Sequence, residues 1–532
     1  MRALALLFCL TASPLAAKPR ESLLAPAGRV IASIKIESNN VFETDAPPEN
    51  KLLYRAANDF HIRTRERIIA RELLFEVGDL YDPALIAETE RNLRALPFLR
   101  RADAEATVNK EGTVDVVVRT YDSWSLEVVA GFKRAGGLST LKAGLTEHNI
   151  TGEGKAASAV YSRVGLVESK SFSYQDPQFL DTKHLLYAMS AVDSPGIRNY
   201  SLSLNHPFYA SIVPSSAGGT FTYGQSAVSN YVGRIPDGLV TKSVGEAGIN
   251  YGVALATSTE RTRRVTFGLL AHGAEYTAIP GAPPVSVPGP EQMGFFQLSG
   301  DFEQLDFITV RRIAKFTHDE DYNLGLAVLP AVQWAPFVRA WGSTESQIVP
   351  GVTVTKGYTW ADQLLFLNSG YSSKYVNGFD SNRIATVGGS YFIRGLKYQT
   401  LAFHSALDVG WHLDPAAPLT LGEANGLRGY GLNAFNGDRR FLFNVEDRLY
   451  VWDELLRLLD VGAVAFYDSG YAWPATSSIK VGDLKSAVGL GLRLAPSRSA
   501  DNSPVRIDAA YALSSNQTRS RWSLSILAGQ AF

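Results

Sequence analysis

The sequence predicts an all-β transmembrane barrel of about 16 antiparallel strands, preceded by a small α+β domain. Three observations lead to this fold class. The chain begins with a leader typical of exported proteins, it has no apolar run of about 18 residues that could form a membrane helix, and its C-terminal part alternates with period two. An exported, strand-rich chain without a spanning helix is either a secreted soluble β-protein or an outer-membrane barrel.

Residues 1–17 have the layout of a secretory signal peptide. Arg2 is followed by an apolar run from Ala3 to Leu10 and then by small residues up to Ala17, after which we expect cleavage. The single cysteine, Cys9, lies in the apolar run, so the mature chain is expected to use neither disulfides nor thiol chemistry. A lipoprotein leader is rejected because bulky Phe8 precedes the cysteine and the apolar run would be too short.

The composition is that of a folded chain with more than one domain. Of its 532 residues 45% are hydrophobic and 11% aromatic, and the formal net charge is −1. This balance argues neither for nucleic acid as a partner nor for a strongly anionic surface, and no nucleic acid is expected. Any basic patch would have to be local.

Residues 28–120 predict an α+β domain in the order β-α-α-β-β. Pro83 suits the first turn of the second helix, and the proline-containing stretch Asp45–Asn58 is expected to be an irregular insertion. The expected elements are a strand at Val30–Ile36, helices at Thr64–Leu74 and Ala84–Leu96, and strands at Ala102–Val108 and Thr113–Thr120.

Residues 123–532 alternate between an apolar face and a charged face. Leu126, Val128 and Ala130 share one face while Glu127 and Lys133 share the other. A lipid-facing wall around a polar lumen requires this pattern, although a soluble sandwich also alternates. Repetition over about 400 residues, with aromatic residues near strand ends, favours the membrane barrel. At about 16 strands, each strand and its connection would have about 26 residues.

A Gly- and Asn-rich loop that begins at Leu421 is expected to precede two strands, Phe441–Tyr450 and Val461–Trp473. The loop tip is an apolar-Arg-Gly-aromatic tetrad, in which the glycine lets the backbone turn sharply beside the arginine. The tetrad consists of Leu427, Arg428, Gly429 and Tyr430.

Two acids on the following strands are candidate partners of the loop arginine. Period-two alternation puts Glu446 and Arg448 on one face of the first strand, and Asp468 lies near the end of the second. The pattern predicts a buried cation, Arg428, that faces two buried acids.

The tetrad resembles the (V/L/I)-R-G-(F/Y) signature of the sixth extracellular loop in the BamA/TamA superfamily of outer-membrane barrels, which includes the two-partner secretion transporters. The following N-V-E-D-R and F-Y-D-S-G-Y-A-W resemble the two strands after that loop. The resemblance implies that the loop folds into the barrel, where Arg428 meets Asp468 and Glu446. The shared strand face of Glu446 and Arg448 is also consistent with an ordinary lumen charge pair. Asp447 departs from the pattern, because alternation points it at lipid; we expect a local irregularity or a place at the water interface.

Other segments carry the same resemblance. Residues 28–120 resemble a single POTRA domain, the periplasmic module of this superfamily, placed before a bacterial surface antigen barrel. The stretches Ile150–Gly154 and Gln175–Leu180 resemble its first two periplasmic turns. The end of the chain, Arg521–Phe532, resembles the terminal strand read by the outer-membrane assembly machinery, with Phe532 as its sorting residue.

The strand count between Gly294 and His412 is too high for this family, which has eleven strands before the loop. Either some stretches are hairpins within loops or the barrel has more than 16 strands. The Pro-rich stretch Ile279–Pro290 is expected to be an extracellular loop.

By resemblance, the protein is an outer-membrane protein insertion and assembly factor, or a polypeptide translocation factor, that needs no nucleotide. Its expected partners are outer-membrane lipid, unfolded polypeptide clients, and periplasmic or lipoprotein partners of the POTRA-like domain, which could also be a rigid spacer. We expect few hydrogen bonds where the first strand, Trp124–Lys133, meets the last, Trp522–Phe532, so that this edge can open. The alternatives are a dedicated secretion pore for one passenger protein and a porin-like surface antigen.

No catalytic residue, metal or cofactor is expected. The sequence has no Gly-x-Ser-x-Gly elbow, phosphate-binding loop or His-Glu-x-x-His pair, which disfavours an outer-membrane lipase. The best metal-like cluster, His318-Asp319-Glu320-Asp321, is interpreted as a solvated turn.

Overall fold

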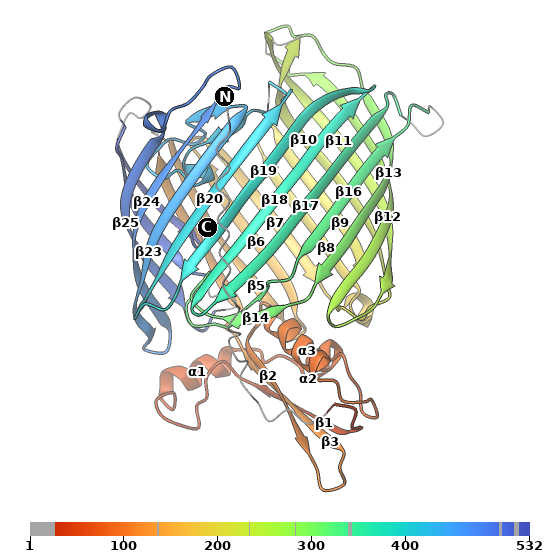
Figure 1. The fold of residues 1–532 in the computed structure, drawn as a ribbon, viewed down its shortest axis with the longest axis vertical. Coiled ribbons are helices and arrows are strands. Elements are labelled where there is room, and N and C mark those ends of the chain that lie inside the picture. The colour runs from red at the N-terminus through yellow and green to blue at the C-terminus, as the bar shows by residue number, and fades with distance from the viewer. Residues whose placement is uncertain are drawn as a thin grey trace.

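A computed structural model describes residues 27–532 apart from 136–137, 233–234, 282, 339–342, 416, 500–502 and 515–520. The expected signal peptide, with Cys9, lies outside the described residues. A three-stranded sheet with its helices precedes one closed β-barrel and lies against one end of it (Figure 1). Within the described part of the chain, no helix is long and apolar enough to cross a membrane.

The N-terminal part is a mixed sheet with the order β1-β3-β2, in which β1 runs parallel and β2 antiparallel to β3. Its core includes Ile69, Leu93 and Val116, which are fully buried. The expected insertion Asp45–Asn58 is wrong in part, because a helix begins inside it. The elements are β1 (Ile31–Asn39), α1 (Leu52–Phe60), α2 (Glu66–Glu72), α3 (Pro83–Ala95), β2 (Leu99–Val108) and β3 (Val114–Asp122).

All neighbouring strands of the barrel are antiparallel, and β27 closes the wall against β4. The wall strands are β4 (Leu126–Ala135), β5 (Leu138–Ile150), β6 (Lys155–Val164), β7 (Val167–Asp176), β8 (Leu186–Ser194), β9 (Ile197–His206), β10 (Ser215–Val232), β11 (Ile235–Ala256), β12 (Arg261–Ala278), β13 (Glu291–Gln304), β16 (Ala327–Ala335), β17 (Gln347–Trp360), β18 (Gln363–Val376), β19 (Phe379–Ile393), β20 (Gln399–Trp411), β23 (Arg439–Leu455), β24 (Leu459–Trp473), β25 (Lys485–Pro496), β26 (Val505–Ala512) and β27 (Trp522–Ala528).

The barrel has 20 strands in the described part of the chain, so the expectation of about 16 is wrong. Fifteen wall strands precede the loop that carries the Leu-Arg-Gly-Tyr tetrad. The crowded stretch between Gly294 and His412 contains five complete wall strands, β16 to β20, and one hairpin outside the wall, β14 (Phe307–Val310) with β15 (Glu320–Asn323). Period-two alternation assigns each residue of a strand to the inner or the outer face, but it does not determine how many strands form the closed wall.

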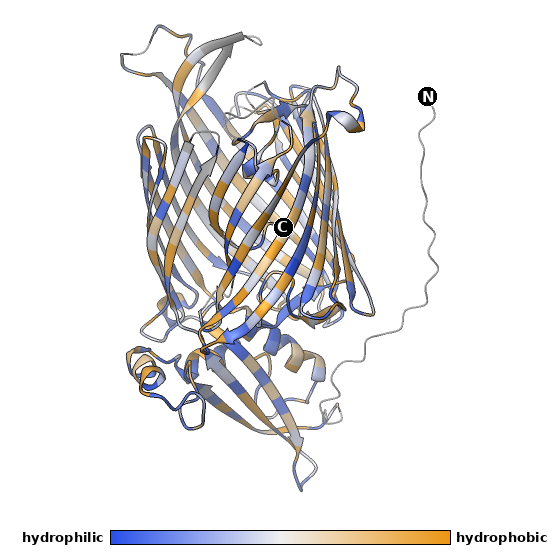
Figure 2. Ribbon diagram, turned by 90° about the vertical axis from the view of Figure 1, so that its left-hand side faces the viewer, coloured by the Kyte–Doolittle hydropathy of each residue, from blue (hydrophilic) through white to orange (hydrophobic). Residues whose placement is uncertain are grey.

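Hydrophobic and hydrophilic residues alternate along the strands of the wall, as the ribbon coloured by hydropathy shows (Figure 2). On β25, Leu490 and Leu492 are exposed on the outer surface, whereas Arg493 is buried inside. Residues 279–290, expected to be a loop, join β12 to β13. This arrangement is the one that a wall between lipid and a polar lumen requires.

Two segments enter the lumen from opposite ends. From the end beside the N-terminal domain comes the connection 305–326, which contains the β14–β15 hairpin. From the far end comes the connection 412–438, with β21 (Leu419–Leu421), the 3-10 turn Glu423–Asn425 and β22 (Phe435–Gly437). Two further 3-10 turns lie at Phe179–Asp181 and Val481–Asp483. The end of the chain also lies within the barrel (Figure 1).

The N-terminal domain docks on the barrel through α2 and α3. Both oxygens of Glu88 on α3 accept hydrogen bonds of 2.6 Å from Ser211, one from its main-chain N–H and one from its hydroxyl. Arg94 on the same helix makes a two-pronged ion pair with Asp321 of the inward hairpin, at 2.8 and 2.9 Å. The domain therefore contacts the barrel rim and the segment that fills its lumen.

Candidate functional site

The tip of the inward loop is tightly held. Leu427 and Tyr430 are buried, and the Tyr430 hydroxyl donates to the main-chain oxygen of Ser486 at 2.9 Å. Gly429 has a φ of +87°, and a Cβ there would lie 3.2 Å from the Cβ of Ala487. Glycine is required at this position because the backbone is left-handed and because the wall strand that carries Ala487 leaves little room for a side chain.

Arg428 is 4% exposed and makes its shortest contacts with two strands of the wall, β23 and β24. Its Nε and Nη2 donate to the two oxygens of Asp468 at 2.7 and 2.8 Å, and its Nη1 donates to Glu446 at 2.7 Å. The guanidinium also lies 3.5 Å from the ring centre of Phe466. A planar cation with five donors suits this arrangement, since it satisfies two carboxylates and stacks on an aromatic face. The structure thus brings together the loop arginine and both acids singled out in the sequence.

Arg448 continues the network toward the N-terminal domain. Its Nε donates to Glu446 at 2.8 Å, its Nη1 to the main-chain oxygen of Ile313 at 2.8 Å, and its Nη2 to that of Phe532 at 3.1 Å. One buried side chain therefore ties the wall to the inward hairpin and to the end of the chain.

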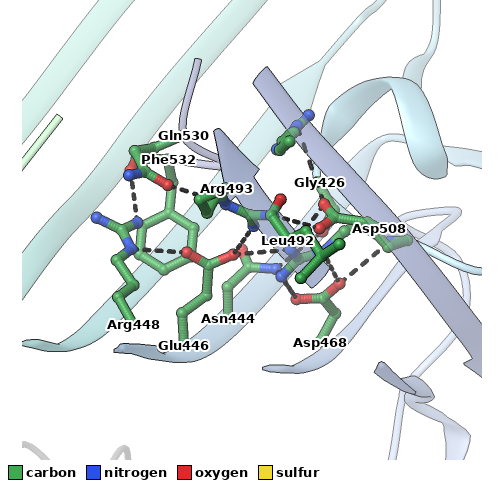
Figure 3. A network of polar contacts seen from close by, with 12 residues as sticks. Gly426, Asn444, Glu446, Arg448, Asp468, Leu492, Arg493, Asp508, Gln530 and Phe532 are labelled. Atoms are coloured by element: carbon green, nitrogen blue, oxygen red, sulfur yellow. Dashed lines mark hydrogen bonds and ion pairs between the residues drawn. The ribbon is translucent and has the colours of Figure 1, made fainter. Parts of the chain in front are cut away.

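Two network residues were not among the sequence candidates. Arg493 donates to Asp508 at 2.6 Å and lies 3.5 Å from Glu446, and Asp508 lies 3.5 Å from Arg428 (Figure 3). The inward face of β25 and β26, read by alternation, was the signal that could have found them. The acids of the network outside the loop thus come from β23, β24 and β26.

Asp447 lies on the outward face, between two inward residues of the network. The register is unbroken from Glu446 to Arg448, and the first irregularity of this pairing comes between Tyr450 and Trp452. A local irregularity at Asp447 is therefore not the explanation for its place in the pattern.

The sequence interpretation of His318-Asp319-Glu320-Asp321 as a solvated turn is wrong. His318 is buried and bonded to the main-chain oxygen of Ser497 at 3.0 Å. Glu320 is buried and accepts from the main-chain N–H groups of Ile313 and Ala314. The four side chains point to different partners and hold the tip of the inward hairpin; among the described residues no group of three or more His, Cys, Asp or Glu could hold a metal ion.

The expected terminal strand Trp522–Phe532 is too long, because β27 ends at Ala528. Gly529 has a φ of +82°, and after it the chain turns into the lumen. The ring of Phe532 stacks on His404 with 5.4 Å between ring centres and packs in a cluster with Phe392. The structure thus places Phe532 inside the barrel; its sorting role remains a prediction.

The seam between the first and last wall strands is incompletely paired. Strand β27 pairs with β4 at Phe132, Lys133 and Arg134, whereas β5 pairs with β4 along its whole length. Among the described residues no strand pairs with the seam side of 126–131. The closing edge therefore keeps main-chain groups that another strand could use.

A cavity of about 480 Å³ lies beside the open half of the seam. Its walls come from the N-terminal domain (Phe42, Leu53, Tyr54), from β4 (Leu126, Val128, Ala130), and from the β25–β26 region (Pro496, Val505). The lining is mainly apolar, so a side chain that enters beside the strand edge would be desolvated.

No protein-family model matches the chain, and no curated protein matches it by sequence. Solved structures similar to it include BamA from Haemophilus ducreyi lacking POTRA domains 1–3, with 12% identity and a TM-score of 0.39 over 94% of this chain and 85% of that one. CdiB from Acinetobacter baumannii has 11% identity and a TM-score of 0.46, with coverages of 94% and 74%. CdiB from Escherichia coli has 11% identity and a TM-score of 0.46, with coverages of 97% and 94%.

Proposed function

We propose that this chain is a bacterial outer-membrane barrel that inserts or translocates other polypeptides without a nucleotide. In this proposal residues 1–17 are a signal peptide, residues 28–120 are a POTRA-like periplasmic module, and residues 123–532 form the membrane barrel. Its partners are outer-membrane lipid and unfolded polypeptides, with periplasmic or lipoprotein partners at the module. The proposal assigns the protein no catalytic step, metal or cofactor.

The observation that carries the proposal is the seam. Lower β4, residues 126–131, has no described strand partner on its seam side, and the apolar cavity lies next to it. An unpaired strand edge gains main-chain hydrogen bonds when an extended segment is added to it. A client strand could therefore pair there with its apolar side chains covered, and no energy source beyond binding and folding is needed.

The ion network supports this role by cross-linking strands β23 to β26, which lie next to the seam. It joins β23, β24 and β26 to the inward loop through Arg428, and to the inward hairpin through Arg448. Strand β26 pairs with β27, so the network braces the wall on the β27 side of the seam while β4, on the other side, makes no contact with it among the described residues. We therefore assign Arg428 a structural role in the proposed activity.

A reversible disulfide across the seam tests the proposal. Phe132 and Ile526 are register partners. Such partners lie roughly 4.5–5.5 Å apart between Cα atoms, within the range of about 4.4–6.8 Å that a disulfide spans. The variant Phe132→Cys/Ile526→Cys, in a Cys9→Ala background, should lose client insertion when oxidised and regain it on reduction.

The matched control is Val354→Cys/Ser369→Cys, which locks β17 to β18 far from the seam. It should insert clients normally in both redox states. Insertion is measured with purified protein in vesicles and in cells by the outer-membrane proteome. A seam-locked barrel that inserts clients at the unlocked rate would refute the templating proposal.

A second candidate, a secretion pore for one passenger protein, has an observation of its own. A polar cavity of about 520 Å³ lies along the inner wall away from the ion network, and its lining includes Thr220, Glu246, Asn250, His272 and Gln297. Secretion through the lumen would not need the seam to open. This function would be favoured if the Phe132→Cys/Ile526→Cys variant still exports a passenger protein when its disulfide is formed, and inserts no client in either the oxidised or the reduced state.

A further inference from the structure

The helix α1 has an apolar edge that the N-terminal domain does not cover. Leu52 is 84% exposed, Leu53 63% and Phe60 83%. These residues lie on one side of the helix, because residues 53 and 60 are seven apart and residue 52 lies beside them. The opposite side holds Tyr54, which is buried against Val41 and Phe42. A short helix therefore carries large apolar side chains on two sides, one inside the protein and one outside it.

The barrel holds α1 at a fixed place beside its rim. The Tyr54 hydroxyl donates to the main-chain oxygen of Leu456, in the turn between β23 and β24, at 2.8 Å. Just before the helix, Glu49 accepts from Arg498 at 2.7 Å, and Arg498 also pairs with Glu454 of the same turn region at 3.2 Å. One contact from within the helix and one from the residues just before it therefore hold α1 against the barrel.

The exposed edge of α1 continues the outer surface of the barrel. Leu53 and Tyr54 line the same cavity as Leu126 and Val128, which are exposed on the outer face of β4. The turn that binds Tyr54 also exposes Leu456. The helix thus lies at the rim of the barrel, beside the apolar outer face of the first residues of β4.

The charges around α1 suit a lipid surface. Lys51, Arg55 and Arg63 are exposed within residues 51–63, against one exposed acid, Asp59. Interfacial helices bury an apolar face at the boundary of headgroups and acyl chains, and their basic residues contact anionic headgroups. The composition and the place of α1 meet both conditions.

We propose that α1 is an interfacial anchor, whose Leu52, Leu53 and Phe60 insert into the periplasmic leaflet of the membrane beside the seam. The inference rests on the proposed function, because it requires the barrel to be in a bilayer. The anchor fixes the N-terminal domain against the lipid at the place where the closing edge is open. Its occupant is lipid, and a second copy of the chain or another protein is an alternative that the test separates.

Nitroxide labels on the full chain, reconstituted in vesicles of phosphatidylethanolamine and phosphatidylglycerol, test the anchor. In a Cys9→Ala background, Phe60→Cys and Leu53→Cys place a label on the edge, and Arg55→Cys places one on the polar side. Ile249→Cys, exposed on the outer face of β11, reports whether the barrel is in lipid. Labels at 53 and 60 should collide with oxygen rather than with a water-soluble nickel chelate, at a depth of roughly 5–10 Å. The label at 55 should stay in water.

The outcomes separate the two proposals. If the label at 249 is in lipid and the labels at 53 and 60 are as accessible to nickel as that at 55, the anchor is refuted and the membrane location stands. If the label at 249 is also in water, both proposals fail. Labels at 53 and 60 that are shielded from oxygen and nickel alike would mean that protein covers α1, which also overturns the anchor.

Discussion

The change Arg428→Ala should destabilise the folded barrel strongly. Removal of the guanidinium leaves Glu446 with Arg448 at 2.8 Å and Arg493 at 3.5 Å. Asp468 is fully buried and would keep, among the contacts of the described residues, the Asn444 amide at 2.7 Å and the main-chain N–H of residue 428 at 3.3 Å, but no cation. A buried carboxylate that loses its cation costs about 3–5 kcal/mol, so most of the loss should come from Asp468.

A double-mutant cycle tests this origin of the loss. In Arg428→Ala/Asp468→Asn no carboxylate is left without a cation, so the free energy of unfolding should recover much of what Arg428→Ala loses. The measurements are the temperature at which heat-modifiable gel migration is lost, urea unfolding in vesicles, and the amount assembled in the outer membrane. Arg198→Ala is the control, because its pair with Asp193 is exposed and 3.5 Å long, and should cost about 0–1 kcal/mol. An Arg428→Ala barrel as stable as the control would refute the reasoning.

Two further predictions concern the contact of the N-terminal domain with the barrel. Arg94→Ala breaks the ion pair with Asp321 and should free the inward hairpin, at a cost of about 1.5–3 kcal/mol. Amide exchange in residues 305–326 should then be faster than in the control Arg101→Ala, which breaks an exposed pair with Asp103. Equal exchange in the two variants would contradict the prediction. Burial raises the pKa of Glu72 from 4.5 to about 7, so its stabilising effect is complete below pH 4.5 and is lost as the pH rises through 7. The unfolding free energy of the protein, relative to Glu72→Gln, should therefore fall across that range by up to roughly 3 kcal/mol, and a constant difference would contradict the assignment. His184, 3.7 Å from Glu72, is neutral over most of this range because burial lowers its pKa to about 4.

The centre of the site could be predicted from local sequence patterns, because it is built from strand alternation and one glycine turn. Gly429 between Arg428 and Tyr430 marks the sharp tip, and period two brings Glu446 and Arg448 to the same inner face. The same rule, applied to β25 and β26, places Arg493 and Asp508 inside. The inward orientation of these residues can be predicted without knowing how many strands the barrel has.

Features set by long-range docking were not predictable in this way. The nine-residue helix α1 is too short to be recognised by periodicity next to prolines, and contacts such as that of Tyr54 with Leu456 help to hold it. His318 is polar and sits in an acidic run, yet docking of the hairpin inside the barrel buries it. Likewise, Phe532 continues the alternation of a strand, but the turn at Gly529 takes it into the lumen.

The most direct test of the account is whether a client polypeptide pairs with lower β4 during insertion. A photo-crosslinking residue in place of Ala130, on the open edge, should form adducts with newly synthesised, pulse-labelled outer-membrane polypeptides. The same residue in place of Ile249, on the outer face of β11, should form none. Adducts absent from position 130 while insertion proceeds, or equal at the two positions, would contradict a seam that receives the client strand.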